Sequence, residues 1–216
     1  MKMKFVVCGL FLAAVALGVW YQLAPKRSTP AISANDLLIV RNIDHKKGAE
    51  NATMTLIEYL DFECEACGAY YPLVKHLGAE FKDDLQIVTR YFPVPGHKNA
   101  MPAALAVEAA SRQGRFWEMH DLLFEKQKEW GERKAADPKI FIEYARELGL
   151  DMEAFQRDVV SDDVRLRVEM DRNDGMNLGV ESTPTFFLNG EQMPNPRSSE
   201  EFHALIQQAF SSSKQQ

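Results

Sequence analysis

The sequence predicts an α/β domain with an inserted helical subdomain, preceded by an apolar N-terminal segment. A strand pattern at Met54–Leu60, a helix opening at Cys64 and a second strand at Leu85–Phe92 have the strand–helix–strand order that forms parallel sheets. A long helical stretch at about residues 99–178 then separates this unit from a hairpin and a closing helix near the C-terminus.

Length and charge limit the classes of function. The 216 residues suffice for one compact domain with a sizeable core. The chain carries 31 acidic and 25 basic residues, for a net charge of −6. A basic groove is therefore not expected, and we predict no nucleic-acid partner.

The N-terminal segment is typical of an export signal. Basic residues precede an apolar run at Phe5–Ala24, and about twenty apolar residues can span a bilayer. The small residues Ala16 and Gly18 leave signal-peptidase cleavage open. We expect residues 1–25 to be a signal or a membrane anchor and residues 26–50 to be a tether and lead-in.

The first strand carries an acid among leucines. The segment Leu37–Val40 can form a short strand or helix, which periodicity alone does not decide. In Met54–Leu60, alternation places Glu58 on the face of Leu56 and Leu60. We expect Glu58 to be buried, and the alternative is a solvated strand edge.

Two cysteines lie where this strand meets the following helix, which we expect to run to about Phe81 with a kink at Pro72. Unpaired N–H groups and the positive end of the helix dipole stabilise a thiolate at this position. We therefore interpret Cys64 as the attacking sulfur and Cys67 as its resolving partner.

The rest of the chain is expected to be helical before a final hairpin. Helices are predicted at about residues 99–113, 115–130, 138–148, 152–159 and 162–177. Thr185–Leu188 and Glu191–Met193 flank an Asn-Gly turn and form a hairpin. An amphipathic helix at Ser199–Phe210 and a frayed tail at 211–216 complete the chain.

The number of cysteines favours redox chemistry. Cys8 lies in the apolar segment, so the remainder holds only Cys64 and Cys67. Structural disulfides usually close longer loops, which favours a catalytic pair in an exported domain. Zinc would need two further ligands, and the histidines are scattered, so we predict no metal. No cofactor is implied, because the cysteine pair is itself the redox group.

Three motifs give the chain a resemblance to a known family. They are Asp61–Gly68 (DFECEACG), Phe92–His97 (FPVPGH) and Glu181–Gly190 (ESTPTFFLNG). With the order of elements, they resemble the DsbA-like branch of the thioredoxin superfamily over about residues 51–210, with the helical insertion at about 99–178.

The resemblance implies a thioredoxin fold and roles for three more residues. Pro184 matches a cis proline that faces the disulfide, and with Thr183 it would leave backbone groups free to pair with an extended substrate. Glu58 matches a buried acid that exchanges a proton with the second cysteine. Burial would raise the pKa of this carboxyl and suit it to that role.

The function expected from the resemblance is extracytoplasmic thiol–disulfide exchange, at the periplasm or cell surface, either tethered to the membrane or secreted. The expected activity introduces disulfides into unfolded or partly folded exported proteins. A membrane redox partner, either a quinone-linked oxidase or an electron donor, would complete the cycle. The alternatives are a disulfide reductase or isomerase of the same fold, and a non-catalytic peptide-binding chaperone.

Two features concern the strength of the oxidant. Glu65-Ala66 replaces the Pro-His of the best-known family member, so Glu63 and Glu65 place anions beside Cys64. We expect them to raise the Cys64 pKa relative to that member and to give an intermediate, less oxidising protein. His97, in the loop after the second strand, either tunes the thiols or is solvated; His120 is expected on a helix surface or packed.

Overall fold

A computed structural model describes residues 33–131 and 135–213. The apolar segment expected at residues 1–25 lies outside these ranges, as does Cys8. In the part of the chain that is described, no helix has both the length and the apolar character needed to cross a membrane. From Ala34 onward the chain forms one compact unit.

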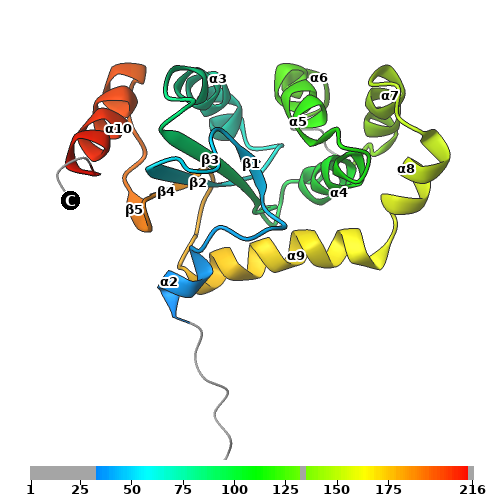
Figure 1. The fold of residues 1–216 in the computed structure, drawn as a ribbon. Coiled ribbons are helices and arrows are strands. Elements are labelled where there is room, and N and C mark those ends of the chain that lie inside the picture. Colours follow the sequence, from blue (N-terminus) through cyan, green and yellow to red (C-terminus); the bar gives the residue numbers. More distant parts are fainter. Residues whose placement is uncertain (1–32, 132–134, 214–216) are drawn as a thin grey trace, which may run out of the picture. The chain divides into compact units, whose positions relative to one another are not determined.

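A mixed five-stranded sheet lies at the centre of this unit (Figure 1). Its strands are β1 (His45–Lys47), β2 (Met54–Leu60), β3 (Leu85–Tyr91), β4 (Thr185–Leu188) and β5 (Glu191–Met193), in the order β1-β3-β2-β4-β5. The β2–β3 pair is parallel, as predicted, and the other neighbours are antiparallel. Strand β1 was not predicted, because its three residues, His-Lys-Lys, show no apolar alternation.

The helices follow the predicted order with two differences. They are α2 (Ala34–Leu37), α3 (Glu65–Glu80), α4 (Ala100–Ser111), α5 (Phe116–Glu125), α6 (Gln127–Trp130), α7 (Lys139–Glu147), α8 (Met152–Asp158), α9 (Asp162–Asn177) and α10 (Ser199–Ser213). The helix expected at 115–130 is divided at Lys126, which leaves helical geometry at φ −103° and ψ 12°. Helix α10 extends into the expected tail, where the hydroxyls of Ser211 and Ser212 donate to carbonyls one turn earlier.

The lead-in segment is part of the sheet assembly. Helix α2 occupies only the start of the Leu37–Val40 region, and β1 adds a strand to the edge of β3. Residues 34–47 therefore belong to the folded unit, although they fall within the segment expected as tether and lead-in.

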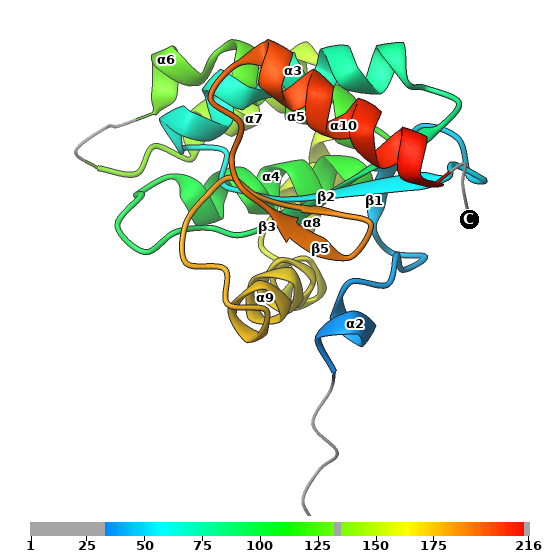
Figure 2. The ribbon, with the colours of Figure 1, turned by 90° about the vertical axis from the view of Figure 1, so that its left-hand side faces the viewer.

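Helices cover both faces of the sheet (Figure 2). Helices α3 and α10 pack on one face through Leu77 and Phe202, which share a buried apolar cluster with Leu56 of β2. Helix α9 runs along the opposite side, as Figure 2 shows. A second cluster joins the end of β2 to helices α4–α9, so the helical insertion shares its core with the edge of the sheet that carries the cysteines.

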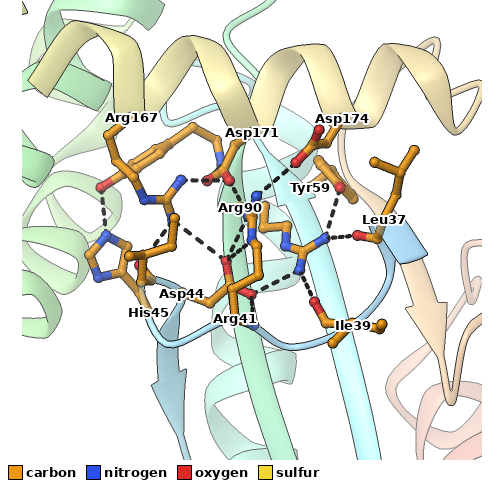
Figure 3. A network of polar contacts seen from close by, with 12 residues as sticks. Leu37, Ile39, Arg41, Asp44, His45, Tyr59, Arg90, Arg167, Asp171 and Asp174 are labelled. Atoms are coloured by element: carbon orange, nitrogen blue, oxygen red, sulfur yellow. Dashed lines mark hydrogen bonds and ion pairs between the residues drawn. The ribbon is translucent and has the colours of Figure 1, made fainter. Parts of the chain in front are cut away.

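A buried ion network ties the N-terminal segment to β3 and α9 (Figure 3). Arg90 is fully buried and donates to Asp44 at 2.8 Å and to the carbonyl of Ile39 at 2.8 Å. Arg41 pairs with both Asp44 and Asp171, at 2.7 and 2.5 Å. The network therefore joins three parts of the chain that are far apart in the sequence.

Candidate active site

The two cysteines lie at the start of α3, directly after the C-terminal end of β2. Cys64 is the N-cap residue of the helix, with extended backbone angles (φ −68°, ψ 120°), and its amide donates to the Asp61 carbonyl at 3.1 Å. Cys64 is partly exposed, whereas Cys67 is completely buried in the first turn. Both are free thiols in this structure, and both lie at the junction of strand and helix where the sequence predicted them.

The surroundings of Cys64 favour its thiolate. A hydrogen bond from the Cys67 thiol has the largest effect, and together with the side chain of Thr183 and the amides of Ala66 and Cys67 it outweighs partial burial. These groups lower the pKa of Cys64 to about 5. This pKa lies between about 3.5 for DsbA and about 7 for thioredoxin, as expected from the sequence.

Cys67 and Glu58 are perturbed in the opposite direction. Burial, followed by the hydrogen bond and charge of Cys64 and the charge of Glu58, raises the pKa of Cys67 well above its ordinary value. Glu58 is only 4% exposed, and burial raises its pKa to about 8. A buried Glu58 agrees with its position on the leucine face and contradicts a solvated strand edge.

A cavity of about 210 Å³ extends from Glu58 toward the helices. Its walls come from β3, α3 and α5 and include Tyr71, Trp117 and Phe124. Lys75 also lines the cavity and remains about half exposed. The carboxyl of Glu58 is therefore buried in the sheet but borders a hollow with polar groups at its margin.

The Thr183-Pro184 segment lies against Cys64. Its peptide bond is cis, as the resemblance implied. The Cys64 thiol donates to the Thr183 carbonyl over 3.3 Å, and the Pro184 carbonyl accepts a bond from the Asn195 side chain at 2.8 Å. The structure thus brings together residues 119 positions apart in the chain.

Asp61 connects the cysteine loop to the loop after β3. It is 1% exposed, and its carboxylate accepts hydrogen bonds from the amides of Glu63 (2.8 Å) and Val94 (2.9 Å). Nδ1 of His97 lies 2.7 Å from the same carboxylate. His97 is therefore a partly exposed loop histidine that is also paired with a buried carboxylate, so pairing and solvation occur together.

Glu63 is directed into the protein rather than toward solvent beside the thiol. Its carboxylate accepts from the amide of Asn99 at 2.5 Å and from the Asn99 side chain at 3.3 Å, and both residues are buried. Glu63 is not among the main groups that shift the Cys64 pKa. The expected intermediate pKa is found, but the anionic neighbours proposed from the sequence are not its leading cause.

Sequence reasoning missed Gln127, which binds the cysteine loop from the helical insertion. Its side-chain amide donates to the carbonyls of Phe62 and Cys64, both at 2.8 Å. Nothing in the residues around Gln127 signals this contact, because the two segments meet only after the insertion folds back. Asp61 and Asn99 could have been suspected as polar residues at a strand end and a helix start.

His120 is a packed histidine, as expected. It is 7% exposed, and its Nδ1 lies 2.9 Å from Asp121. Burial lowers the pKa of His120 despite that carboxylate. Among residues 33–131 and 135–213, no three His, Cys, Asp or Glu side chains gather in a way that could hold a metal ion.

Sequence comparisons give a family match and a set of longer relatives. A thioredoxin family model matches residues 41–208. The Na⁺/H⁺ antiporter NhaA of Herminiimonas arsenicoxydans is 42% identical over 151 residues, which are 70% of this chain and 23% of that protein. NhaA 3 of Salinispora tropica is 36% identical over 79% of this chain and 25% of its own length. The chain thus spans about a quarter of these curated relatives.

Similar solved structures have the same fold. Wolbachia pipientis α-DsbA1 superposes with a TM-score of 0.74 at 19% identity, covering 84% of this chain and 98% of that one. BdbD from Bacillus subtilis gives 0.69 at 22% identity, covering 78% and 93%. A thioredoxin-like oxidoreductase from Silicibacter pomeroyi gives 0.68 at 25% identity, covering 84% and 98%. The chain therefore belongs to the thioredoxin family and has the fold of its DsbA-like members.

Proposed function

We propose that the chain is an extracytoplasmic thiol–disulfide oxidoreductase that introduces disulfides into exported proteins. The observation that carries this proposal is the contrast between the two cysteines. Cys64 is accessible with a pKa of about 5, whereas Cys67 is buried with a raised pKa. A sulfur that is a good leaving group and a partner held as a thiol are the properties that disulfide exchange needs.

The proposed reaction begins with the Cys64–Cys67 disulfide. A client thiolate attacks the Cys64 sulfur, the Cys64–Cys67 bond breaks, and Cys67 leaves with the electron pair and takes up a proton. A second client thiolate then attacks the client sulfur of the mixed disulfide. Cys64 leaves as a stabilised thiolate, so two electrons pass from the client to the cysteine pair. A membrane oxidant of the quinone-linked class would restore the disulfide.

Glu58 is the proposed source of the proton that Cys67 takes up. With a pKa of about 8, Glu58 is protonated at neutral pH, and it is close enough to influence the titration of Cys67. The cavity beside it supports a route by which the proton is replaced from solvent. An acid with a pKa near the working pH transfers protons effectively in both directions.

Clients are proposed to bind along the Thr183-Pro184 segment. This segment lies within hydrogen-bond distance of Cys64, so an extended client chain beside it would present its cysteine to the reactive sulfur. Backbone pairing of this kind gives affinity with little sequence preference. That property suits an enzyme that acts on many unfolded proteins.

The proposed location is outside the cytoplasm and close to a membrane. The apolar run at Phe5–Ala24 supports a signal or anchor. The antiporter relatives add support for a nearby membrane, since the matched region occurs in proteins named for transport of ions. Antiport itself is not proposed for this chain, which matches only about a quarter of those proteins.

The redox potential of the Cys64–Cys67 pair tests the direction of electron flow. Equilibration in glutathione buffers is expected to give a value above about −180 mV. A value below about −230 mV would instead favour a reductase or isomerase supplied by an electron donor. The second measurement uses the variant Cys64→Ser, which should lose client oxidation if the chain is an oxidoreductase. A variant that still promoted client folding would identify a non-catalytic chaperone.

A further inference from the structure

We propose that His97 is a positioning residue of the thiol site, whose imidazolium, held by Asp61, stabilises the Cys64 thiolate and makes the cysteine pair more oxidising. His97 lies on the loop between β3 and α4, 33 residues after Cys64 in the sequence. This inference rests on the proposed exchange function, because it concerns the same sulfur.

Asp61 provides the physical link between His97 and Cys64. Its side chain binds His97 Nδ1 at 2.7 Å, while its main-chain carbonyl accepts the amide of Cys64 at 3.1 Å. The same carboxylate also accepts the amide of Val94, which fixes the start of the His97 loop. The imidazole is therefore held beside the cysteine loop by a buried residue and does not depend on a flexible contact.

The hydrogen bond to Asp61 determines where the imidazole protons lie. A carboxylate accepts a proton at Nδ1, so a neutral His97 carries its hydrogen there and takes its second proton at Nε2. About a third of the His97 side chain is exposed, so the resulting cation is partly hydrated. Burial opposes this charge, but Asp61, with contributions from Cys64 and Glu63, raises the pKa of His97.

The influence between His97 and Cys64 is mutual. A Cys64 anion favours protonation of His97, so a His97 cation must favour ionisation of Cys64 to the same degree. The two residues between the cysteines, Glu65 and Ala66, carry no positive charge. A distant histidine brought close by the fold therefore supplies a positive charge that the Cys-x-x-Cys segment lacks.

Other charged groups lie around His97. Glu63 precedes Cys64 and is turned toward α4, and Lys98 follows His97 in the chain. Glu169 and Arg172 of α9 line the same surface hollow as His97. Helix α9 thus contributes one negative and one positive side chain to this hollow. Asp61 is the carboxylate in direct contact with the ring, and it is therefore the group on which the proposed charge depends.

The decisive variant is His97→Gln, which keeps a side-chain donor for Asp61 but cannot carry a charge. Titration of the thiolate absorbance in the full chain is expected to show the Cys64 pKa raised by about half a unit, since the hydrogen bonds to the sulfur have larger effects than His97. In glutathione buffers the reduced form is expected to lose about threefold in stability relative to the disulfide, or about 15 mV. Both effects should shrink at high salt, because a partly exposed charge is screened.

His76→Gln is the matched control. His76 is also paired with a carboxylate, Glu80, and is largely exposed. It lies twelve residues along α3 from Cys64, about 18 Å at the rise of an α-helix. The same change of histidine to glutamine should leave the Cys64 pKa and the glutathione equilibrium unchanged.

His97→Lys separates charge from shape. Restoration of a low Cys64 pKa by this variant supports the proposal, since lysine supplies a cation of different form. An unchanged Cys64 pKa in His97→Gln, or an equal and salt-independent shift in both variants, overturns it. Failure of the proposed function looks different: the wild-type protein would then not exchange with glutathione, while the Cys64 titration could still be compared between variants.

Discussion

Gln127 occupies the space that a side chain at Gly68 would need. A Cβ atom added to Gly68 would lie 2.1 Å from Oε1 of Gln127, whose amide group holds the carbonyls of Phe62 and Cys64. Helix α3 and the helical insertion therefore meet at this point without room for a methyl group. The contact connects the cysteine loop to a segment about sixty residues later in the chain.

Gly68→Ala is expected to lower the free energy of unfolding by about 1–3 kcal/mol, because the new methyl group displaces Gln127. Gln127→Ala should cost about 2 kcal/mol through its two lost hydrogen bonds. The double variant should cost less than the sum, since removal of Gln127 makes space for the methyl group. Urea denaturation of the reduced proteins measures all three, and strict additivity would show that the two residues do not compete.

Cys67 is expected to control the reactivity of Cys64. The hydrogen bond from the Cys67 thiol is the largest cause of the low Cys64 pKa of about 5. Cys67→Ala should raise that pKa by about one unit or more, whereas Cys67→Ser should raise it less, because a hydroxyl still donates. Thiolate absorbance against pH gives both values, and equal shifts in the two variants would contradict this cause.

Glu58→Gln tests the buried acid through stability. The native carboxyl has a pKa of about 8, raised from the ordinary value of about 4.5, so the native state keeps a proton that the unfolded chain releases between these two values. The contribution of this proton to the free energy of unfolding is full below the unfolded pKa and is lost as pH rises through this window. The reduced variant should gain on the order of 4 kcal/mol over wild type as pH rises from about 4.5 to 8.

The same variant tests the proposed proton transfer. Exchange steps in which Cys67 gains or loses a proton should be slower in Glu58→Gln, because glutamine cannot carry the proton. Glu80→Gln, at a partly exposed position on α3, is the control. Unchanged single-turnover exchange rates in Glu58→Gln would remove the proton-transfer role and leave only the effect on stability.

Glu63 is expected to act on stability more than on the thiol. Because its carboxylate is bound by Asn99, Glu63→Gln should shift the Cys64 pKa by less than about half a unit. It should lower the free energy of unfolding by about 1–2 kcal/mol through a weakened hydrogen bond to a charged group. The exposed neighbour Glu65→Gln is the comparison, and a large fall in the Cys64 pKa with Glu63→Gln would restore the interpretation made from the sequence.

The sequence predicted those parts of the fold that depend on local periodicity. The limits of β2 were predicted at Met54–Leu60 because alternation and turn residues define them, and α3 was predicted to within a residue. The Asn-Gly turn likewise located the final hairpin. The burial of Glu58 was readable too, because strand alternation places it among leucines.

The undetected features depend on contacts between distant segments. Strand β1 has no apolar pattern, and it is recognised as a strand by its antiparallel pairing with β3. The direction of Glu63 depends on Asn99, 36 residues later, so sequence proximity to Cys64 was misleading. His97 was ambiguous for the same reason, since only the fold shows that Asp61 receives it.

Asp44 is expected to be the most sensitive position of the ion network. It accepts from Arg90, and both side chains are fully buried. Asp44→Ala would remove the carboxylate that pairs with the buried Arg90 cation, and it should lower the free energy of unfolding by about 3–5 kcal/mol. Denaturation midpoints compare it with Asp163→Ala, an exposed acid that should change stability little; similar losses in both would contradict this assignment.

The ion network also fastens the N-terminal end of the fold to two different elements. If the N-terminal segment holds the protein to a membrane, any pull enters the fold near Leu37 and Ile39, whose carbonyls are bound by Arg90 of β3. The pull is then shared between the sheet and α9 through Arg41 (Figure 3). Residues 37–44 are thus fastened to both β3 and α9, so a force applied at this end of the fold would load these ion pairs before it reached β2 and the cysteine loop.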